Sequence, residues 1–90
     1  IYAVGAGVVT FAARNGAYGN MVEINHGNGI ATRYGHALEL LVEPGDIVRT
    51  GDVIGKVGNS GRSTGPHIHY EVLKNGTQVN PHPYIYRARR

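Results

Sequence analysis

Short apolar runs recur along this chain, and glycines and polar residues separate them. The clearest runs are rich in β-branched and aromatic residues, which favour strands, and they cover residues 7–13, 21–26, 30–34 and 67–72. No segment has the 3.6-residue period of an amphipathic helix. The pattern therefore predicts an all-β domain, built mainly from an antiparallel sheet with glycine-rich loops and almost no helix.

Two tight turns place neighbouring runs side by side. Gly27-Asn28-Gly29 separates residues 21–26 from residues 30–34, which predicts a hairpin. Lys74-Asn75-Gly76 predicts a second hairpin, with residues 77–79 as the returning strand. These turns fix the pairing of four predicted strands.

Composition narrows the possible chemistry. The chain has 90 residues and no cysteine, which excludes disulfides and thiolate metal sites, so any metal must be held by histidine, carboxylate, carbonyl or water. The net charge is only +3, and no basic stripe is interleaved with aromatic residues, so we expect no nucleic-acid partner. No apolar run approaches the length of a transmembrane segment.

Histidines are the candidates for chemistry. His67 and His69 lie two residues apart on a predicted strand, so their side chains are expected on the same face. Neutral imidazole can bind zinc and can also move protons near neutral pH, which suits a metal-assisted hydrolytic site. The alternative is that both are ordinary surface residues. His36 follows the strand predicted over residues 30–34, and His26 precedes a turn, where we expect it to hydrogen-bond main chain.

Two acidic residues are better explained by turns than by catalysis. Asp46 and Asp52 each follow a glycine and precede two aliphatic residues. An aspartate in this position can hydrogen-bond the main chain just after it. We therefore do not expect either carboxylate in a catalytic site.

Several of these features together resemble the lysostaphin-like, or LytM-type, zinc endopeptidases that cut peptidoglycan. The features are residues 32–36, the two Gly-Asp turns, residues 58–71, and Asn75-Gly76 followed by Asn80-Pro81. They span nearly the whole chain in the family's order. The resemblance implies a zinc metalloendopeptidase that hydrolyses stem and cross-bridge peptides of peptidoglycan in an open groove. It also implies a location in the bacterial cell envelope: periplasmic, on the outer surface or secreted.

The resemblance also implies residue roles. His69 matches the family's zinc ligand, while His67 and His36 match the histidines that assist the attacking water and stabilise the oxyanion. The family's other ligands, a His and an Asp, precede the segment that residues 1–5 resemble. We therefore expect residues 1–90 to be a single peptidase domain without its N-terminal ligand-bearing segment, and an upstream segment or an additional chain to complete the zinc site. No residue is assigned to substrate binding.

Two alternatives belong to other functional classes. A non-catalytic LytM-like domain would bind peptidoglycan or activate an amidase, but the presence of both His67 and His69 argues against it. A biotinyl or lipoyl carrier shares the turn chemistry and needs an exposed lysine at a hairpin tip. Lys56 and Lys74 are not in that context.

Overall fold

A computed structural model of the protein describes residues 1–57 and 69–79. His67 lies outside the described residues, so its orientation relative to His69 stays a prediction. The described strands are β1 (Gly7–Arg14), β2 (Asn20–Gly27), β3 (Ile30–Leu40), β4 (Ile47–Val48), β5 (Gly55–Val57), β6 (His69–Lys74) and β7 (Thr77–Val79). A single turn of 3-10 helix, η1 (Gly16–Tyr18), follows β1.

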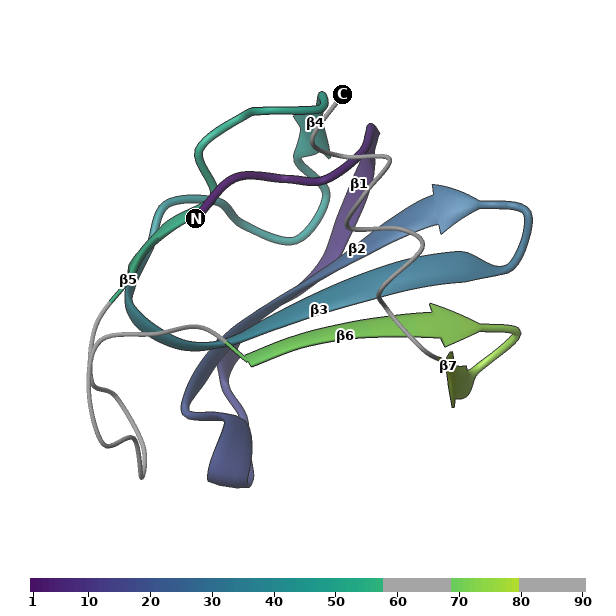
Figure 1. Ribbon diagram of the computed structural model, residues 1–90. Helices are drawn as coiled ribbons and strands as arrows, with labels where there is room; N and C mark the ends of the chain where they lie inside the picture. Colours follow the sequence, from purple (N-terminus) through teal and green to yellow (C-terminus); the bar gives the residue numbers. More distant parts are fainter. Residues whose placement is uncertain (58–68, 80–90) are drawn as a thin grey trace.

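The strands form one antiparallel sheet in the order β4-β1-β2-β3-β6-β7, and β5 pairs with β3 off this path (Figure 1). The predicted all-β, mainly antiparallel fold is confirmed. Within the described parts of the chain, no helix is long and apolar enough to cross a membrane.

Both predicted hairpins are present because their turn residues can adopt left-handed backbone conformations. Asn28 and Gly29 have φ of 53° and 77° between β2 and β3, and Asn75 and Gly76 have φ of 52° and 81° between β6 and β7. Two-residue turns with positive φ match the right-handed twist of paired strands, and Asn-Gly accepts this geometry at low cost.

The strand β3 is longer than the sequence pattern predicted. The prediction ended it at Tyr34, but β3 continues through Gly35 to Leu40. A glycine suits this position because Tyr18 lies close to the strand: a Cβ on residue 35 would be 3.2 Å from Cδ1 of Tyr18. Beyond this point β3 changes neighbours, from β6 to β5.

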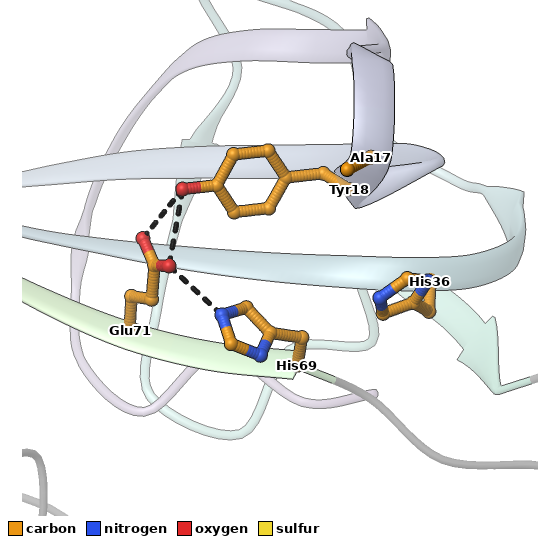
Figure 2. Close-up of a pocket in the computed structure, with 5 residues that line it drawn as sticks. All are labelled: Ala17, Tyr18, His36, His69 and Glu71. Carbon is orange, nitrogen blue, oxygen red and sulfur yellow. Dashed lines mark hydrogen bonds and ion pairs between the residues drawn. The ribbon is translucent and has the colours of Figure 1, made fainter. Parts of the chain in front are cut away.

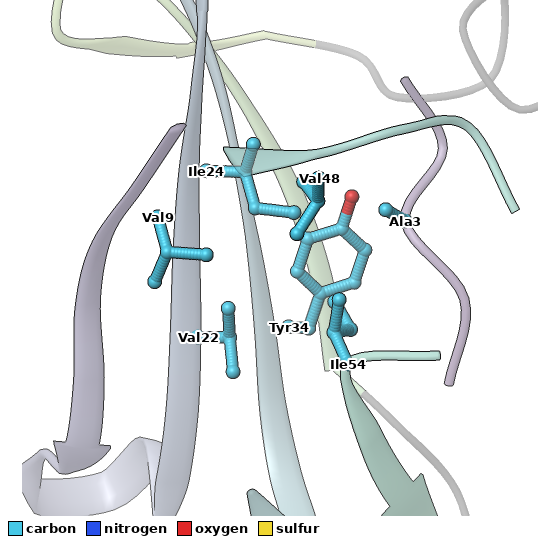
Figure 3. Packing of buried hydrophobic residues seen from close by; sticks show 7 residues of the cluster. All are labelled: Ala3, Val9, Val22, Ile24, Tyr34, Val48 and Ile54. Carbon is cyan, nitrogen blue, oxygen red and sulfur yellow. The ribbon is translucent and has the colours of Figure 1, made fainter. Parts of the chain in front are cut away.

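The hydrophobic core lies on one face of the sheet (Figure 3). Its buried members are Ala3, Val9, Val22, Ile24, Tyr34, Val48 and Ile54. The N-terminal segment packs on this face, where the Val4 amide donates to the Tyr34 hydroxyl at 3.2 Å and the Thr32 hydroxyl donates to it at 2.7 Å. Side chains alternate along a strand, so the neighbours of these core residues project from the opposite face.

Asp46 and Asp52 are turn residues as predicted, but each carboxylate bonds an amide three residues before it instead of the main chain just after it. Oδ2 of Asp46 accepts from the Glu43 amide at 2.9 Å, and Oδ2 of Asp52 accepts from the Arg49 amide at 2.8 Å. His26 also bonds main chain as predicted, although its Nδ1 lies 2.7 Å from the Ala6 carbonyl of the N-terminal segment instead of in its own turn. These three side chains are explained by the fold.

Candidate functional site

A hollow opens on the polar face of the sheet, where η1, β3 and β6 meet (Figure 2). Its volume is about 400 Å³. The residues that line it are Ala17, Tyr18, His36, His69 and Glu71. Two of the three predicted site histidines therefore come together here from strands far apart in sequence.

His69 and Glu71 are adjacent on one face of β6 because they are two residues apart. Nε2 of His69 lies 2.8 Å from Oε2 of Glu71. A carboxylate only accepts hydrogen bonds, so Nε2 of His69 carries the proton and donates it. In the neutral ring Nδ1 then holds the free lone pair, which is the state that can bind a metal.

The Glu71 carboxylate is buried and has polar partners of its own. Its residue is 6% exposed, and the Tyr18 hydroxyl donates to its two carboxylate oxygens at 2.9 and 3.0 Å. Nη1 of Arg33 lies 3.9 Å from Oε1 and contributes positive charge. A buried carboxylate is tolerated when it is hydrogen-bonded and paired in this way, and it can then fix the ring it contacts.

His36 faces the same hollow from β3. The ring centroids of His36 and His69 are 6.2 Å apart, and their planes are inclined at 83°. The Tyr18 ring also lies next to His69, with the two ring centroids 5.8 Å apart. Two imidazoles and a phenol thus surround one small volume.

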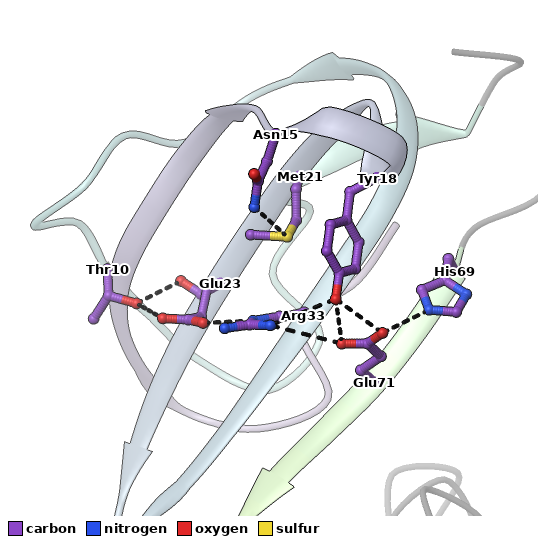
Figure 4. A network of polar contacts seen from close by, with 8 residues as sticks. All are labelled: Thr10, Asn15, Tyr18, Met21, Glu23, Arg33, His69 and Glu71. Carbon is purple, nitrogen blue, oxygen red and sulfur yellow. Dashed lines mark hydrogen bonds and ion pairs between the residues drawn. The ribbon is translucent and has the colours of Figure 1, made fainter. Parts of the chain in front are cut away.

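A chain of polar contacts links the hollow to the neighbouring strands (Figure 4). Nε of Arg33 donates to Oε1 of Glu23 at 2.7 Å, and the Thr10 hydroxyl donates to Oε2 of Glu23 at 2.8 Å. Burial opposes ionisation of Glu23, but the hydrogen bonds from Arg33 and Thr10 and the charge of Arg33 outweigh it, so the pKa of Glu23 lies below its ordinary value. Arg33 therefore lies between two carboxylates, Glu23 and Glu71.

His69 has the features of a metal ligand, although the described residues do not make a whole site. Metal-binding histidines usually donate their other ring N–H to a carboxylate or carbonyl, as His69 does to Glu71. Within residues 1–57 and 69–79, no group of three or more His, Cys, Asp or Glu side chains could hold a metal ion. His69 thus fits zinc chemistry as one ligand.

Sequence reasoning missed Glu71 and Tyr18 as site residues. The signal for Glu71 was available, because it continues the alternation that starts at His67 and His69. Tyr18 carried no such signal. It lies at the end of η1, and its hydroxyl donates to a carboxylate 53 residues further along the chain.

Comparison with known proteins gives consistent matches. The sequence profile of peptidase family M23 matches residues 1–81. The chain is 53% identical over 75 residues to the DD-carboxypeptidase/endopeptidase Mpg of Neisseria meningitidis, covering 83% of this chain and 17% of that protein. It is 47% identical over 81 residues to the peptidoglycan DD-endopeptidase ShyC of Vibrio cholerae, covering 90% and 19%. The chain thus spans less than a fifth of the length of these curated relatives.

Solved structures agree with the sequence matches. The catalytic domain of the antimicrobial peptidase lysostaphin from Staphylococcus simulans superposes with a TM-score of 0.87 at 28% identity, covering 96% of this chain and 69% of that one. A zinc-containing peptidase from Vibrio cholerae superposes with a TM-score of 0.78 at 39% identity, covering 83% and 23%. The matched profile, the sequence identities and the shared lysostaphin-like fold place this chain in peptidase family M23.

Proposed function

We propose that the protein is a zinc-dependent endopeptidase that hydrolyses peptide cross-links of bacterial peptidoglycan. The observation that carries the proposal is the oriented His69, whose Nε2 is held by Glu71 while His36 lies beside it. Membership of a peptidase family and the names of the relatives, which include a peptidoglycan DD-endopeptidase, support the reaction and the substrate. Because peptidoglycan lies in the cell envelope, the proposed place of action is the envelope or its outside.

In this proposal His69 would hold zinc through Nδ1, the ring nitrogen that Glu71 leaves available. The solved zinc-containing peptidase supports the choice of metal. Zinc held there would supply Lewis-acid chemistry, which polarises a scissile carbonyl and activates water. Glu71 and Tyr18 keep the ring of His69 in one tautomer and one orientation, so that less free energy is spent on ordering the ring when the metal binds.

Amide hydrolysis also needs proton transfer. The attacking water must lose a proton to a base, and the oxyanion that its attack creates must be stabilised. We assign one of these tasks to His36, whose ring lies next to that of His69. The other falls to His67, which the sequence predicts on the same face as His69.

Digestion of purified peptidoglycan by the complete protein tests the proposal. Chromatography with mass spectrometry should show cross-linked muropeptides converted to uncross-linked ones, with a new free amino group for each bond cut. A chelator should stop the reaction, and added zinc should restore it. Binding to peptidoglycan with no released product would instead identify a non-catalytic binding domain and refute the proposal.

A further inference from the structure

The pairing of β2 with β3 contains a bulge next to His36. Val22 pairs with Tyr34 and Asn20 pairs with Ala37, so a two-residue step on β2 faces a three-residue step on β3. His36 has a φ of 61°, in the left-handed region that residues other than glycine rarely adopt. The extra residue and the unusual backbone angle occur together, as in β-bulges that redirect a side chain.

The bulge decides which face His36 occupies. In a regular strand His36 would project from the same face as Tyr34, into the core. Instead Tyr34 and Ala37, three residues apart, are both buried at 1% exposure. The extra residue allows both Gly35 and His36 to lie on the opposite face, where Gly35 is crowded by Tyr18 and His36 lines the hollow.

One side chain is bonded to the main chain just after the bulge. Nδ2 of Asn20 lies 3.1 Å from the carbonyl oxygen of Ala37 and 3.3 Å from that of Leu38. A carboxamide has two N–H donors on one nitrogen, so it can serve two neighbouring carbonyls, which a carboxylate cannot do. Asn20 therefore connects β2 to the two residues that follow His36.

From this arrangement we propose that Asn20 is a positioning residue for the hydrolytic reaction. Its carboxamide holds the bulge of β3 and thereby keeps the imidazole of His36 beside His69. Asn20 itself does not line the hollow, so it acts through His36 and not on the substrate. That the bulge serves catalysis rests on the proposed function. That Asn20 sets the position of His36 does not.

Two substitutions in the complete protein test this role. Asn20→Ala removes both donors, and Asn20→Asp keeps the shape but replaces the donors with a group that repels the carbonyls. NMR of histidine-labelled protein should show that His36 loses its positive φ and its ring contacts to His69. With wall peptides, kcat should fall about 10- to 100-fold while KM changes little and zinc stays bound, because misplacing a reacting group by about 1 Å costs on this scale.

Asn25→Ala is the matched control. Asn25 lies near the other end of β2, five residues from Asn20 and at a separate register shift, where its Oδ1 accepts from the Gly27 amide at 2.9 Å. Removing this bond should lower the unfolding temperature without changing kcat or the conformation of His36. A purely structural role for Asn20 would give the same result as this control.

Three results would overturn the proposal: His36 unchanged in φ and ring contacts in both Asn20 variants, kcat at the wild-type value, or complete unfolding of both variants. The last would assign Asn20 to the stability of the sheet. If the wild-type protein cleaves no wall peptide, the proposed function fails, while the NMR comparison still decides whether Asn20 sets the position of His36.

Discussion

Replacing Glu71 with glutamine removes the negative charge beside His69 and keeps the shape of the side chain. The carboxylate accepts from Nε2 of His69 at 2.8 Å and from the Tyr18 hydroxyl at 2.9 and 3.0 Å. Hydrogen bonds to a charged group contribute about 1.5–3 kcal/mol, against about 0.5–1.5 kcal/mol between neutral groups. Loss of the carboxylate that orients a ligand typically lowers metal affinity about 10- to 100-fold. We therefore expect Glu71→Gln to weaken zinc binding by that factor, or about 1.4–2.8 kcal/mol.

The assay is competition for zinc between the complete protein and a chelator of known affinity. Glu23→Gln is the control, because it makes the same chemical change on the same face of the sheet. Glu23 bonds Arg33 and Thr10, and it does not line the hollow. We expect Glu23→Gln to change zinc affinity less than twofold. Equal affinities in wild-type protein and Glu71→Gln, or equal losses in the two variants, would refute the role of Glu71 in orienting His69.

Three further predictions concern stability. Gly35→Ala should cost about 1–3 kcal/mol in chemical denaturation, because the new methyl group would lie 3.2 Å from Cδ1 of Tyr18. Tyr34→Phe should cost about 1–3 kcal/mol in the same assay, since the buried Thr32 hydroxyl and the partly buried Val4 amide lose their acceptor. The pKa of Glu23 is lowered from 4.5 in the folded protein, so the ionised carboxylate stabilises the fold above pH 4.5. This stabilisation is lost as pH falls through the lower folded pKa. The unfolding temperature of Glu23→Gln should therefore depend less on pH in this acidic range than that of the wild-type protein.

Much of the sheet could be predicted from the sequence because its tight turns contain residue pairs that favour them. Asn28-Gly29 and Asn75-Gly76 carry the residues that positive φ requires, and both hairpins form where they were expected. The turn roles of Asp46 and Asp52 follow from the same local chemistry. These features depend on neighbouring residues, so a sequence pattern can show them.

The site depends on contacts between distant residues, which a sequence pattern does not contain. His36 was identified by resemblance, but its face is set by a bulge in the register of β3 against β2. Asn20 and Tyr18 lie far from their partners in sequence, at separations of 17 and 53 residues for the bonds to Ala37 and Glu71. Glu71 is the exception among the site residues, because its spacing of two residues from His69 on one strand can be read from the sequence.

Zinc content measured together with peptidoglycan cleavage, in His69→Ala and His36→Ala variants of the complete protein, tests the central assignment most directly. The account predicts that His69→Ala loses zinc and cleavage together, because a ligand is removed. His36→Ala should keep its zinc and lose about 10²–10⁴-fold in rate, the scale of one general acid–base group. Zinc at the wild-type level in His69→Ala, or cleavage at the wild-type rate in His36→Ala, would contradict the assignment.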